Sequence, residues 1–298
     1  MLLRVKATYT FIMLTISGLL LSLPSCIPDP LEVDNVPMIK REVVVASQML
    51  PEETLLILLT RTFGALEISS NNNVEEILER IAINDAVVTV VGNGSADTLQ
   101  FLGSGFYGGV EIDFKAGETY ALYVKSEEYG EVKAETTVKP QIAFEYVEAE
   151  LVYNEYSDTL VQLVYSFEDP QTDNWYMLSV QKVEAEKFIE DAVNPRTYTR
   201  LIDDSGFNGQ TYTERVSVVA RNYAIGDTIA IMLSNIHEDY YEFIKLRLDQ
   251  RSNFLEFLGE PVNYPSNVTN GKGFFNLYMP DIRTYVLGEE GKISRFIN

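Results

Sequence analysis

Short runs of β-branched, aromatic and leucine residues recur between residues 41 and 139, and turns containing glycine separate most of them. Ala86–Val91 ends at Gly92-Asn93-Gly94, a hairpin signal, and Asp97–Leu102 is its expected partner strand. Further strands are expected at Glu42–Ala46, Thr54–Thr62, Val110–Phe114, Thr119–Lys125 and Val132–Val138. Strands at a spacing of about ten residues are typical of a β-sandwich. The sequence therefore predicts a mainly β fold that begins with an immunoglobulin-like β-sandwich over 41–139.

A second β-rich segment follows Pro140, where the first run of strands stops. Its expected strands are Ile142–Tyr153, Leu160–Glu168, Trp175–Lys182, Thr211–Ala220, Asp227–Asn235 and a final strand Phe274–Met279. Apolar residues take the spacing of a helix in Val74–Ile83 and again in His237–Leu258, which Gly259 ends. We therefore expect two domains, 41–139 and 140–298, the second with one C-terminal helix at 238–258.

The start of the chain is organised like a lipoprotein signal peptide. Arg4 and Lys6 form a short basic region, and an apolar run from Phe11 to Leu23 follows it. Cys26 comes next, after Pro24-Ser25, and it is the only cysteine in the chain. Pro24 departs from the usual pattern, in which a small or β-branched residue occupies this position. A thiol is the one side chain that lipoprotein processing converts into a thioether to diacylglycerol, so Cys26 is the expected lipidation site.

The anchor hypothesis divides the first forty residues. Residues 1–25 are the signal peptide, and residues 26–40, which contain three prolines, read as a tether to the first domain. One alternative is an ordinary signal peptide followed by a cysteine without a lipid. A transmembrane anchor is a weaker alternative, because the apolar run is shorter than the roughly 20 residues that span a bilayer.

The charge of the chain excludes several kinds of partner. The chain has 44 Asp and Glu against 23 Lys and Arg, a net charge of −21. Such a surface repels nucleic acids and anionic lipid headgroups, which leaves the lipid as the expected contact with the membrane. One cysteine and one histidine provide no disulfide and no Cys- or His-rich zinc site, and no spaced calcium loop is present. No metal and no cofactor are expected.

The sequence contains candidate catalytic residues but no recognisable catalytic motif around them. His237 stands beside Glu238 and Asp239 at the start of the expected helix, but no G-x-S-x-G motif accompanies it. Adjacent carboxylates that could serve glycoside cleavage occur at Asp203/Asp204, Glu127/Glu128 and Glu289/Glu290. Several aromatic residues could form a platform on which a sugar stacks: Trp175, Tyr176, Phe207, Tyr240 and Tyr241. Packing in the core is the more common role of such residues. We expect no catalytic residues and a protein that is not an enzyme.

The most distinctive local motif is a loop that contains Asn267, Asn270, Gly271 and Gly273. Glycines permit a positive φ in a tight loop, and asparagine side chains can satisfy backbone groups of that loop. The same residues could also contact a ligand or a partner, because binding residues concentrate on loops held by a rigid scaffold. The motif is therefore the candidate binding site of the sequence.

The C-terminal part resembles a known family. It reads DYYEFIKLRLDQ and then GEPVNYPSNVTNGKGFFNLY, with DNWYMLSV at Asp173–Val180 and DDSGFNGQTY at Asp203–Tyr212. These stretches, with NDAVVTV, GSGFY, AGETYALYV and TTVKP nearer the N-terminus, resemble the Bacteroidetes outer-membrane lipoproteins of DUF4249. The resemblance implies an accessory lipoprotein of nutrient-uptake loci that also encode TonB-dependent receptors. It supplies no catalytic residues.

Three functions remain open from the sequence. The first is a lipid-anchored outer-membrane protein, exposed at the cell surface, that acts as a non-enzymatic accessory or binding component beside a TonB-dependent receptor. The acidic residues Asp29, Glu32 and Asp34, shortly after Cys26, fit such surface export in Bacteroidetes. The second is a secreted hydrolase acting on glycan or peptide, and the third is a purely structural or adhesive envelope protein.

Overall fold

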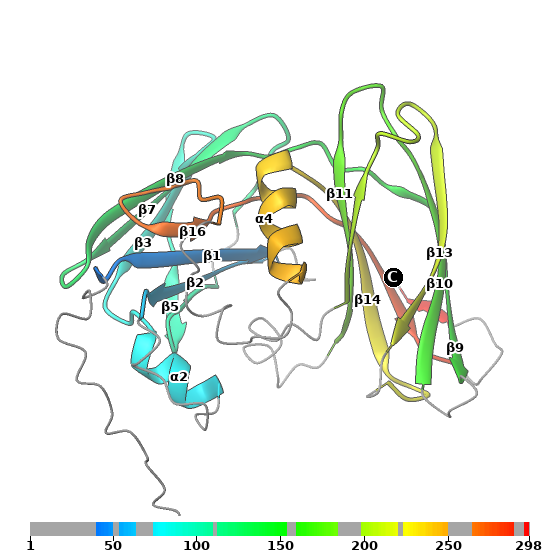
Figure 1. Ribbon diagram of the computed structural model, residues 1–298, viewed down its shortest axis with the longest axis horizontal. Helices are drawn as coiled ribbons and strands as arrows, with labels where there is room; N and C mark the ends of the chain where they lie inside the picture. The colour runs from blue at the N-terminus through cyan, green and yellow to red at the C-terminus, as the bar shows by residue number, and fades with distance from the viewer. Residues whose placement is uncertain are drawn as a thin grey trace, which may run out of the picture. The chain divides into compact units, whose positions relative to one another are not determined.

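The computed structural model describes residues 40–49, 54–63, 74–109, 112–153, 159–183, 198–219, 223–249, 264–288 and 295–297 (Figure 1). Residues 39–298 belong to one unit of the chain. Cys26, the expected signal peptide and nearly all of the expected tether lie outside the described residues. So do Glu289/Glu290 and the part of the expected helix 238–258 that follows Asp249.

The first sandwich consists of two five-stranded sheets. The first sheet has the order β16 (Lys272–Phe274), β1 (Val43–Met49), β2 (Leu55–Arg61), β6 (Phe106–Gly108), β5 (Gln100–Gly103). The second has the order β15 (Val268–Thr269), β8 (Gly130–Thr137), β7 (Thr119–Ser126), β3 (Val87–Gly92), β4 (Ser95–Thr98). Alternate residues of β1 and β7 are buried in one core between them. The prediction of an N-terminal β-sandwich is confirmed.

Strand β2 is apolar along almost its whole length because both of its faces are covered. Ile57 and Leu59 point into the core of the sandwich, whereas Leu56 and Leu58 belong to a separate cluster on the outer face. There they pack against the short helix α2 (Val74–Ile81), whose buried side includes Ile77, Leu78 and Ile81. A strand buried on both faces reads as a continuous hydrophobic run, which explains the sequence LLILL.

The segment expected to form one strand at Asp97–Leu102 forms two. Ser95–Thr98 pairs with β3 as predicted, but Gln100–Gly103 pairs with β6 in the opposite sheet. Leu99 marks the crossing: it is 5% exposed, and its N–H donates to the carbonyl of Val88 at 2.9 Å. The strand expected at Val110–Phe114 is also wrong where the structure describes it, since residues 112–114 lie in no strand.

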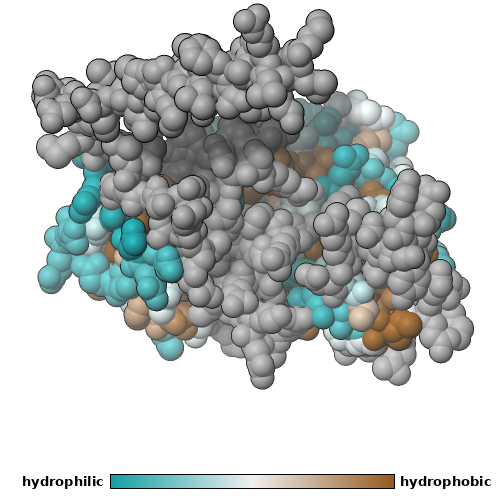
Figure 2. Space-filling model, turned by 60° about the horizontal axis from the view of Figure 1, so that its bottom comes forward, coloured by the Kyte–Doolittle hydropathy of each residue, from teal (hydrophilic) through white to brown (hydrophobic). Residues whose placement is uncertain are grey.

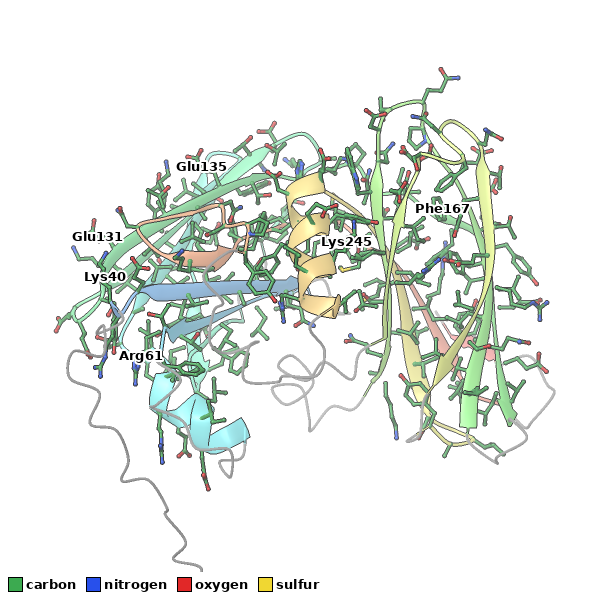
Figure 3. The ribbon with its side chains drawn as sticks, in the orientation of Figure 1. Lys40, Arg61, Glu131, Glu135, Phe167 and Lys245 are labelled. Atoms are coloured by element: carbon green, nitrogen blue, oxygen red, sulfur yellow. The ribbon has the colours of Figure 1, made fainter. Side chains whose placement is uncertain are left out.

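The second sandwich lies after Pro140. Its three-stranded sheet has the order β13 (Thr211–Val219), β10 (Thr159–Glu168), β9 (Phe144–Tyr153). Its five-stranded sheet has the order β12 (Tyr198–Asp203), β11 (Trp175–Lys182), β14 (Thr228–Ile236), β17 (Asp281–Val286), β18 (Arg295–Ile297). The core between these sheets includes Phe167 (Figure 3). Its ring centre lies 4.7 Å from that of Tyr176 on the facing sheet.

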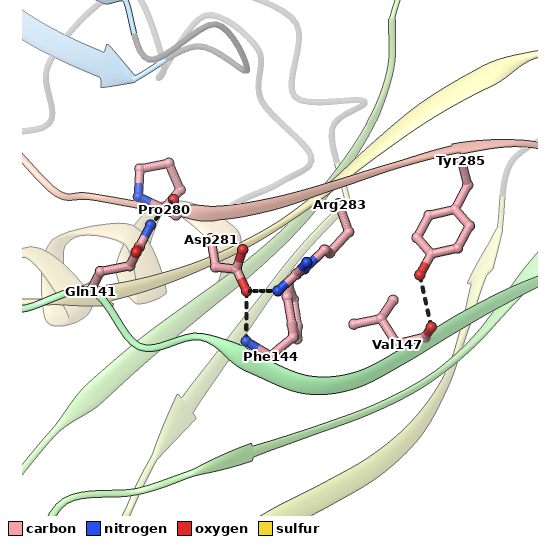
Figure 4. Close-up of polar contacts among 7 residues, drawn as sticks. All are labelled: Gln141, Phe144, Val147, Pro280, Asp281, Arg283 and Tyr285. Carbon is pink, nitrogen blue, oxygen red and sulfur yellow. Dashed lines mark hydrogen bonds and ion pairs between the residues drawn. The ribbon is translucent and has the colours of Figure 1, made fainter. Parts of the chain in front are cut away.

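Polar contacts join the two sheets of the second sandwich along β9 and β17 (Figure 4). The Asp281 carboxylate accepts the N–H of Phe144 at 2.7 Å and the Arg283 guanidinium at 2.9 Å. Farther along the same strands, the Tyr285 hydroxyl donates to the carbonyl of Val147 at 2.7 Å. These bonds hold one edge of the sandwich closed.

Helix α4 (Glu238–Asp249) confirms the predicted C-terminal helix in its described part (Figure 1). Its buried residues Tyr240, Tyr241 and Phe243 join the core of the first sandwich together with Met177 from β11. The helix therefore packs between strands that belong to different sandwiches. None of the helices in the described residues has the length and apolar composition needed to cross a membrane.

Strand pairing crosses the predicted boundary at Pro140. β15 and β16 come from the end of the chain, yet they pair with β8 and β1 of the first sandwich. The expected final strand Phe274–Met279 is wrong, because strand β16 stops at Phe274 and two later strands, β17 and β18, follow in the other sandwich. The division into 41–139 and 140–298 stays a prediction, with the C-terminal segment shared between the two sandwiches.

Candidate functional site

The Asn267–Gly273 loop closes the first sandwich. Val268 lies opposite Ala134 of β8 in one sheet, and Lys272–Phe274 runs parallel to Val44–Ala46 of β1 in the other. The segment thus adds one short strand to each sheet. This double pairing explains why a compact motif of asparagines and glycines stands here.

Asn267 is bound to the backbone on both sides. Its side-chain oxygen accepts the N–H of Phe275 at 2.9 Å, and its nitrogen donates to the carbonyl of the same residue at 2.7 Å. The nitrogen also donates to the carbonyl of Glu135 on β8 at 3.1 Å. One amide therefore takes the place of a neighbouring strand for Phe275 and protects the edge of β8.

The glycines of the motif are required by close approach of β1. Gly273 has a φ of +90°, and a Cβ built on it would lie 2.0 Å from the carbonyl oxygen of Val45. A Cβ on Gly271 would lie 2.7 Å from the carbonyl oxygen of Val43. Asn270 also has a positive φ of 63° and is exposed. Within the described residues, the contacts of Gly271 and Gly273 are structural, and neither lines the groove described next.

A groove of about 510 Å³ lies where the edge of β8 meets β11 and the start of α4. Its lining includes Asn267, one of the predicted binding residues. It also includes Trp175 and His237, which the sequence analysis considered for other roles. The complete lining is Thr119, Glu135, Thr136, Thr137, Lys139, Trp175, His237, Glu238, Asp239, Asn267, Phe274 and Asn276. It is the best candidate for a functional site in the described structure.

Trp175 and Lys139 form one wall of the groove. The Lys139 ammonium lies 5.3 Å from the centre of the Trp175 ring, a cation–π arrangement. Burial lowers the pKa of Lys139, while the carboxylates of Asp204 and Asp173 oppose this change. The single lysine among the lining residues is therefore partly withdrawn from water, and its charge is directed at the indole.

His237 serves the fold at this site. Its Nε2 lies 2.6 Å from the carbonyl oxygen of Thr137, and because that oxygen only accepts, Nε2 is the protonated nitrogen. The residue is partly buried, and its own carbonyl accepts the N–H of Tyr241 in the first turn of α4. The bond to Thr137 fixes the start of the helix against the edge of β8.

The floor of the groove contains Asn276, which has an unusual environment. The residue is 1% exposed, and neither the oxygen nor the nitrogen of its side-chain amide has a hydrogen-bond partner among the described residues. Its backbone N–H and carbonyl are both bonded to the Ser47 hydroxyl, at 2.7 and 3.0 Å. Sequence reasoning missed Asn276 and Lys139, because only the fold brings them together with Trp175.

The two carboxylate pairs that the structure describes, Asp203/Asp204 and Glu127/Glu128, do not line the groove. Asp204 is buried and accepts the N–H of Asn174 at 2.6 Å, and burial, followed by nearby carboxylates, raises its pKa. Asp203 is exposed, and bonds from Ser205 lower its pKa. Glu127 and Glu128 are exposed between β7 and β8. In the described ranges, no set of three or more His, Cys, Asp or Glu is arranged to hold a metal.

The expected aromatic platform is also dispersed. Tyr176 is buried in the second sandwich, and Tyr240 and Tyr241 are buried against the first. Phe207 packs on Tyr212, with ring centres 4.4 Å apart. Trp175 is the one residue of this set that lines the groove.

Comparison with known proteins connects this structure to a family. The family model described as "Domain of unknown function (DUF4249)" matches residues 29–281. No curated protein matches the chain. A solved structure of the chicken CNTN1 FN1–FN3 domains is similar at 11% identity and a TM-score of 0.25, over 65% of this chain. The chain spans 60% of the length of that structure.

We expect Gly273→Ala to destabilise the protein by about 3 kcal/mol, because the new Cβ meets the Val45 carbonyl and the backbone is left-handed. Gly94→Ala is the matched control: φ is +78° there but no atom lies within 4 Å, so only about 1–2 kcal/mol is lost. Urea unfolding measures both values. Equal losses for the two variants would show that β1 does not constrain Gly273.

We expect Asn276→Leu to stabilise the protein by about 1–2 kcal/mol, because it removes a buried amide without hydrogen bonds and keeps a similar volume. Asn267→Leu is the matched control in the same segment, since it breaks three hydrogen bonds and should lose about 2–3 kcal/mol. Urea unfolding again gives the comparison. A lower unfolding free energy for Asn276→Leu would mean that its amide is bonded in solution.

Proposed function

The chain belongs to the DUF4249 family, and from that premise we propose that it is a lipid-anchored accessory protein of the outer membrane. In this proposal it is exposed at the cell surface and binds a ligand beside a TonB-dependent receptor. Cys26 holds it to the membrane through its lipid. It performs no chemistry of its own.

The groove carries the binding part of this proposal. Its floor offers an unbonded amide at Asn276, a group that binds but does not attack a substrate. The one histidine, the usual general base, donates from Nε2 to a backbone carbonyl instead of activating a hydroxyl. This arrangement supports recognition of a ligand over its conversion.

The start of the described body suits a tether. The Thr62 hydroxyl donates to the carbonyl of Lys40 and accepts the N–H of Glu42, both at 3.0 Å. The first described residues are thereby fixed beside β2. The fifteen residues from Cys26 to Lys40 can span at most about 50 Å, which is enough to separate the body from a membrane surface.

The surface fits an exported protein. The net charge is −21, and on the face shown in Figure 2 the described residues are mostly hydrophilic, with hydrophobic ones in small patches. Such a surface supports solubility beside a membrane and opposes nucleic-acid binding. The acyl chains are then the main attachment, and a multi-chain lipid binds a membrane stably.

We expect Cys26→Ala to move the protein from the outer-membrane fraction to the soluble fraction, because no thiol remains for the lipid. Pro24→Ala is the control: it places the usual small residue before Ser25 and should leave the protein in the membrane. Fractionation followed by immunoblotting measures both. If the Cys26→Ala protein stays with the outer membrane, the lipid is not its anchor.

The accessory role is tested by purification from detergent-solubilised outer membranes. We expect a TonB-dependent receptor to co-purify with the tagged protein and to be absent when the Cys26→Ala variant is used. Recovery of the lipoprotein alone, under conditions that keep other receptor complexes intact, would contradict the accessory role. The hydrolase and the adhesive protein stay as hypotheses, and both predict recovery alone.

A further inference from the structure

The floor of the groove contains the strongest unexplained feature of the described molecule. Buried polar groups are nearly always hydrogen-bonded, yet both atoms of the Asn276 amide lack a partner. The Ser47 hydroxyl satisfies its backbone, but the described residues give its amide no partner. An unpaired amide below an open groove points to a ligand that supplies the missing donor and acceptor.

Asn267 shows which geometry such an amide recognises. Nine residues earlier, its oxygen and nitrogen bind an acceptor–donor pair that lies side by side on the backbone of Phe275. Asn276 carries the same pair of atoms, both buried, and is one of the residues that line the groove. Neighbouring hydroxyls of a sugar ring present donors and acceptors at a comparable spacing, since each hydroxyl does both.

The rest of the groove favours a hydroxyl-rich ligand over a peptide. Thr119, Thr136 and Thr137 are among the lining residues, and only Trp175 and Phe274 are large and apolar. A peptide bound in an extended form needs pockets for its side chains. A groove with one indole and many polar groups fits the flat, partly apolar face of a sugar ring.

Charge decides against an anionic ligand. Glu135, Glu238 and Asp239 line the groove, and the one lysine there is directed at Trp175. A carboxylate or phosphate on the ligand would be repelled by these three acidic side chains, and the Lys139 ammonium already interacts with the Trp175 ring. Neutral sugars avoid this repulsion.

We propose that the groove between β8, β11 and the start of α4 binds a neutral saccharide, with Asn276 hydrogen-bonding adjacent hydroxyls and Trp175 packing on the ring. The proposal deepens the proposed function by naming the class of ligand, and it rests on that function only for the source of the sugar. The receptor experiment can succeed while saccharide binding fails, so the two failures are distinguishable.

Trp175 is the only tryptophan in the chain, so its fluorescence reports on this groove alone. The full chain, purified in a detergent without sugar headgroups, is titrated with maltotetraose, cellotetraose, xylotetraose, tetra-N-acetylchitotetraose and, as the peptide probe, tetra-alanine. We expect at least one saccharide to shift the emission saturably and tetra-alanine to leave it unchanged. A shift with tetra-alanine alone, or with no probe, overturns the proposal.

Variants locate the binding site. Asn276→Leu should weaken the saccharide by about tenfold or more, the loss expected for buried hydrogen bonds, while the protein remains folded. Calorimetry with Trp175→Phe, which keeps an aromatic ring, should show weaker binding. The matched control is Tyr146→Phe, an aromatic residue that is 44% exposed on β9 and away from the groove lining, and it should leave the affinity unchanged. Undiminished binding by Asn276→Leu would place the saccharide elsewhere and overturn the assignment.

Discussion

The parallel pairing of β16 with β1 is the contact on which the arrangement of this protein depends. It brings Lys272–Phe274 against Val44–Ala46, although more than two hundred residues separate them in the chain. The fit is close enough that Gly273 has no room for a Cβ beside the Val45 carbonyl. Once this strand is in place, β15 pairs with β8 and the C-terminal segment completes both sheets of the first sandwich.

The same pairing creates the groove. Phe274 is the last residue of β16, Asn276 lies two residues further on, and the chain then continues to β17 in the second sandwich. Helix α4 packs on this segment, with the Tyr240 and Phe243 rings each 5.3 Å from that of Phe274. A segment held between two sandwiches cannot pair along its whole length. Asn276 lies two residues beyond the end of β16, and its buried amide has no partner among the described residues.

Asn267 and Asn276 illustrate how differently the fold treats the same side chain. Both are asparagines in one short segment, and both lie at the groove. The first makes three hydrogen bonds to the backbone, whereas the second makes none through its amide. In the binding role proposed for Asn276, the ligand supplies the partners that the described residues do not.

Features of this fold that depend on neighbouring residues in the sequence were predicted better than features that depend on residues far apart in the chain. Local alternation predicted β11 at its observed limits and β9, β10 and β13 to within two residues at each end. The crossing at Leu99 and the strand β12 were missed, because nothing in the local pattern says which sheet a short strand joins. Among the candidate site residues, Asn267 was found from its motif, but its bond to Glu135 depends on a strand formed 132 residues earlier.

The sequence by itself determined a mainly β chain with a C-terminal helix, a family signature, a strongly acidic composition and a single cysteine. Those features depend on residue type and on short-range spacing. Only the tertiary structure decided that the end of the chain returns to β1, and that Lys139, Trp175, His237 and Asn276 share one groove. Hydrogen-bond partners and burial come from backbone groups far away in the chain, so two asparagines that look alike in the sequence have opposite environments in the fold.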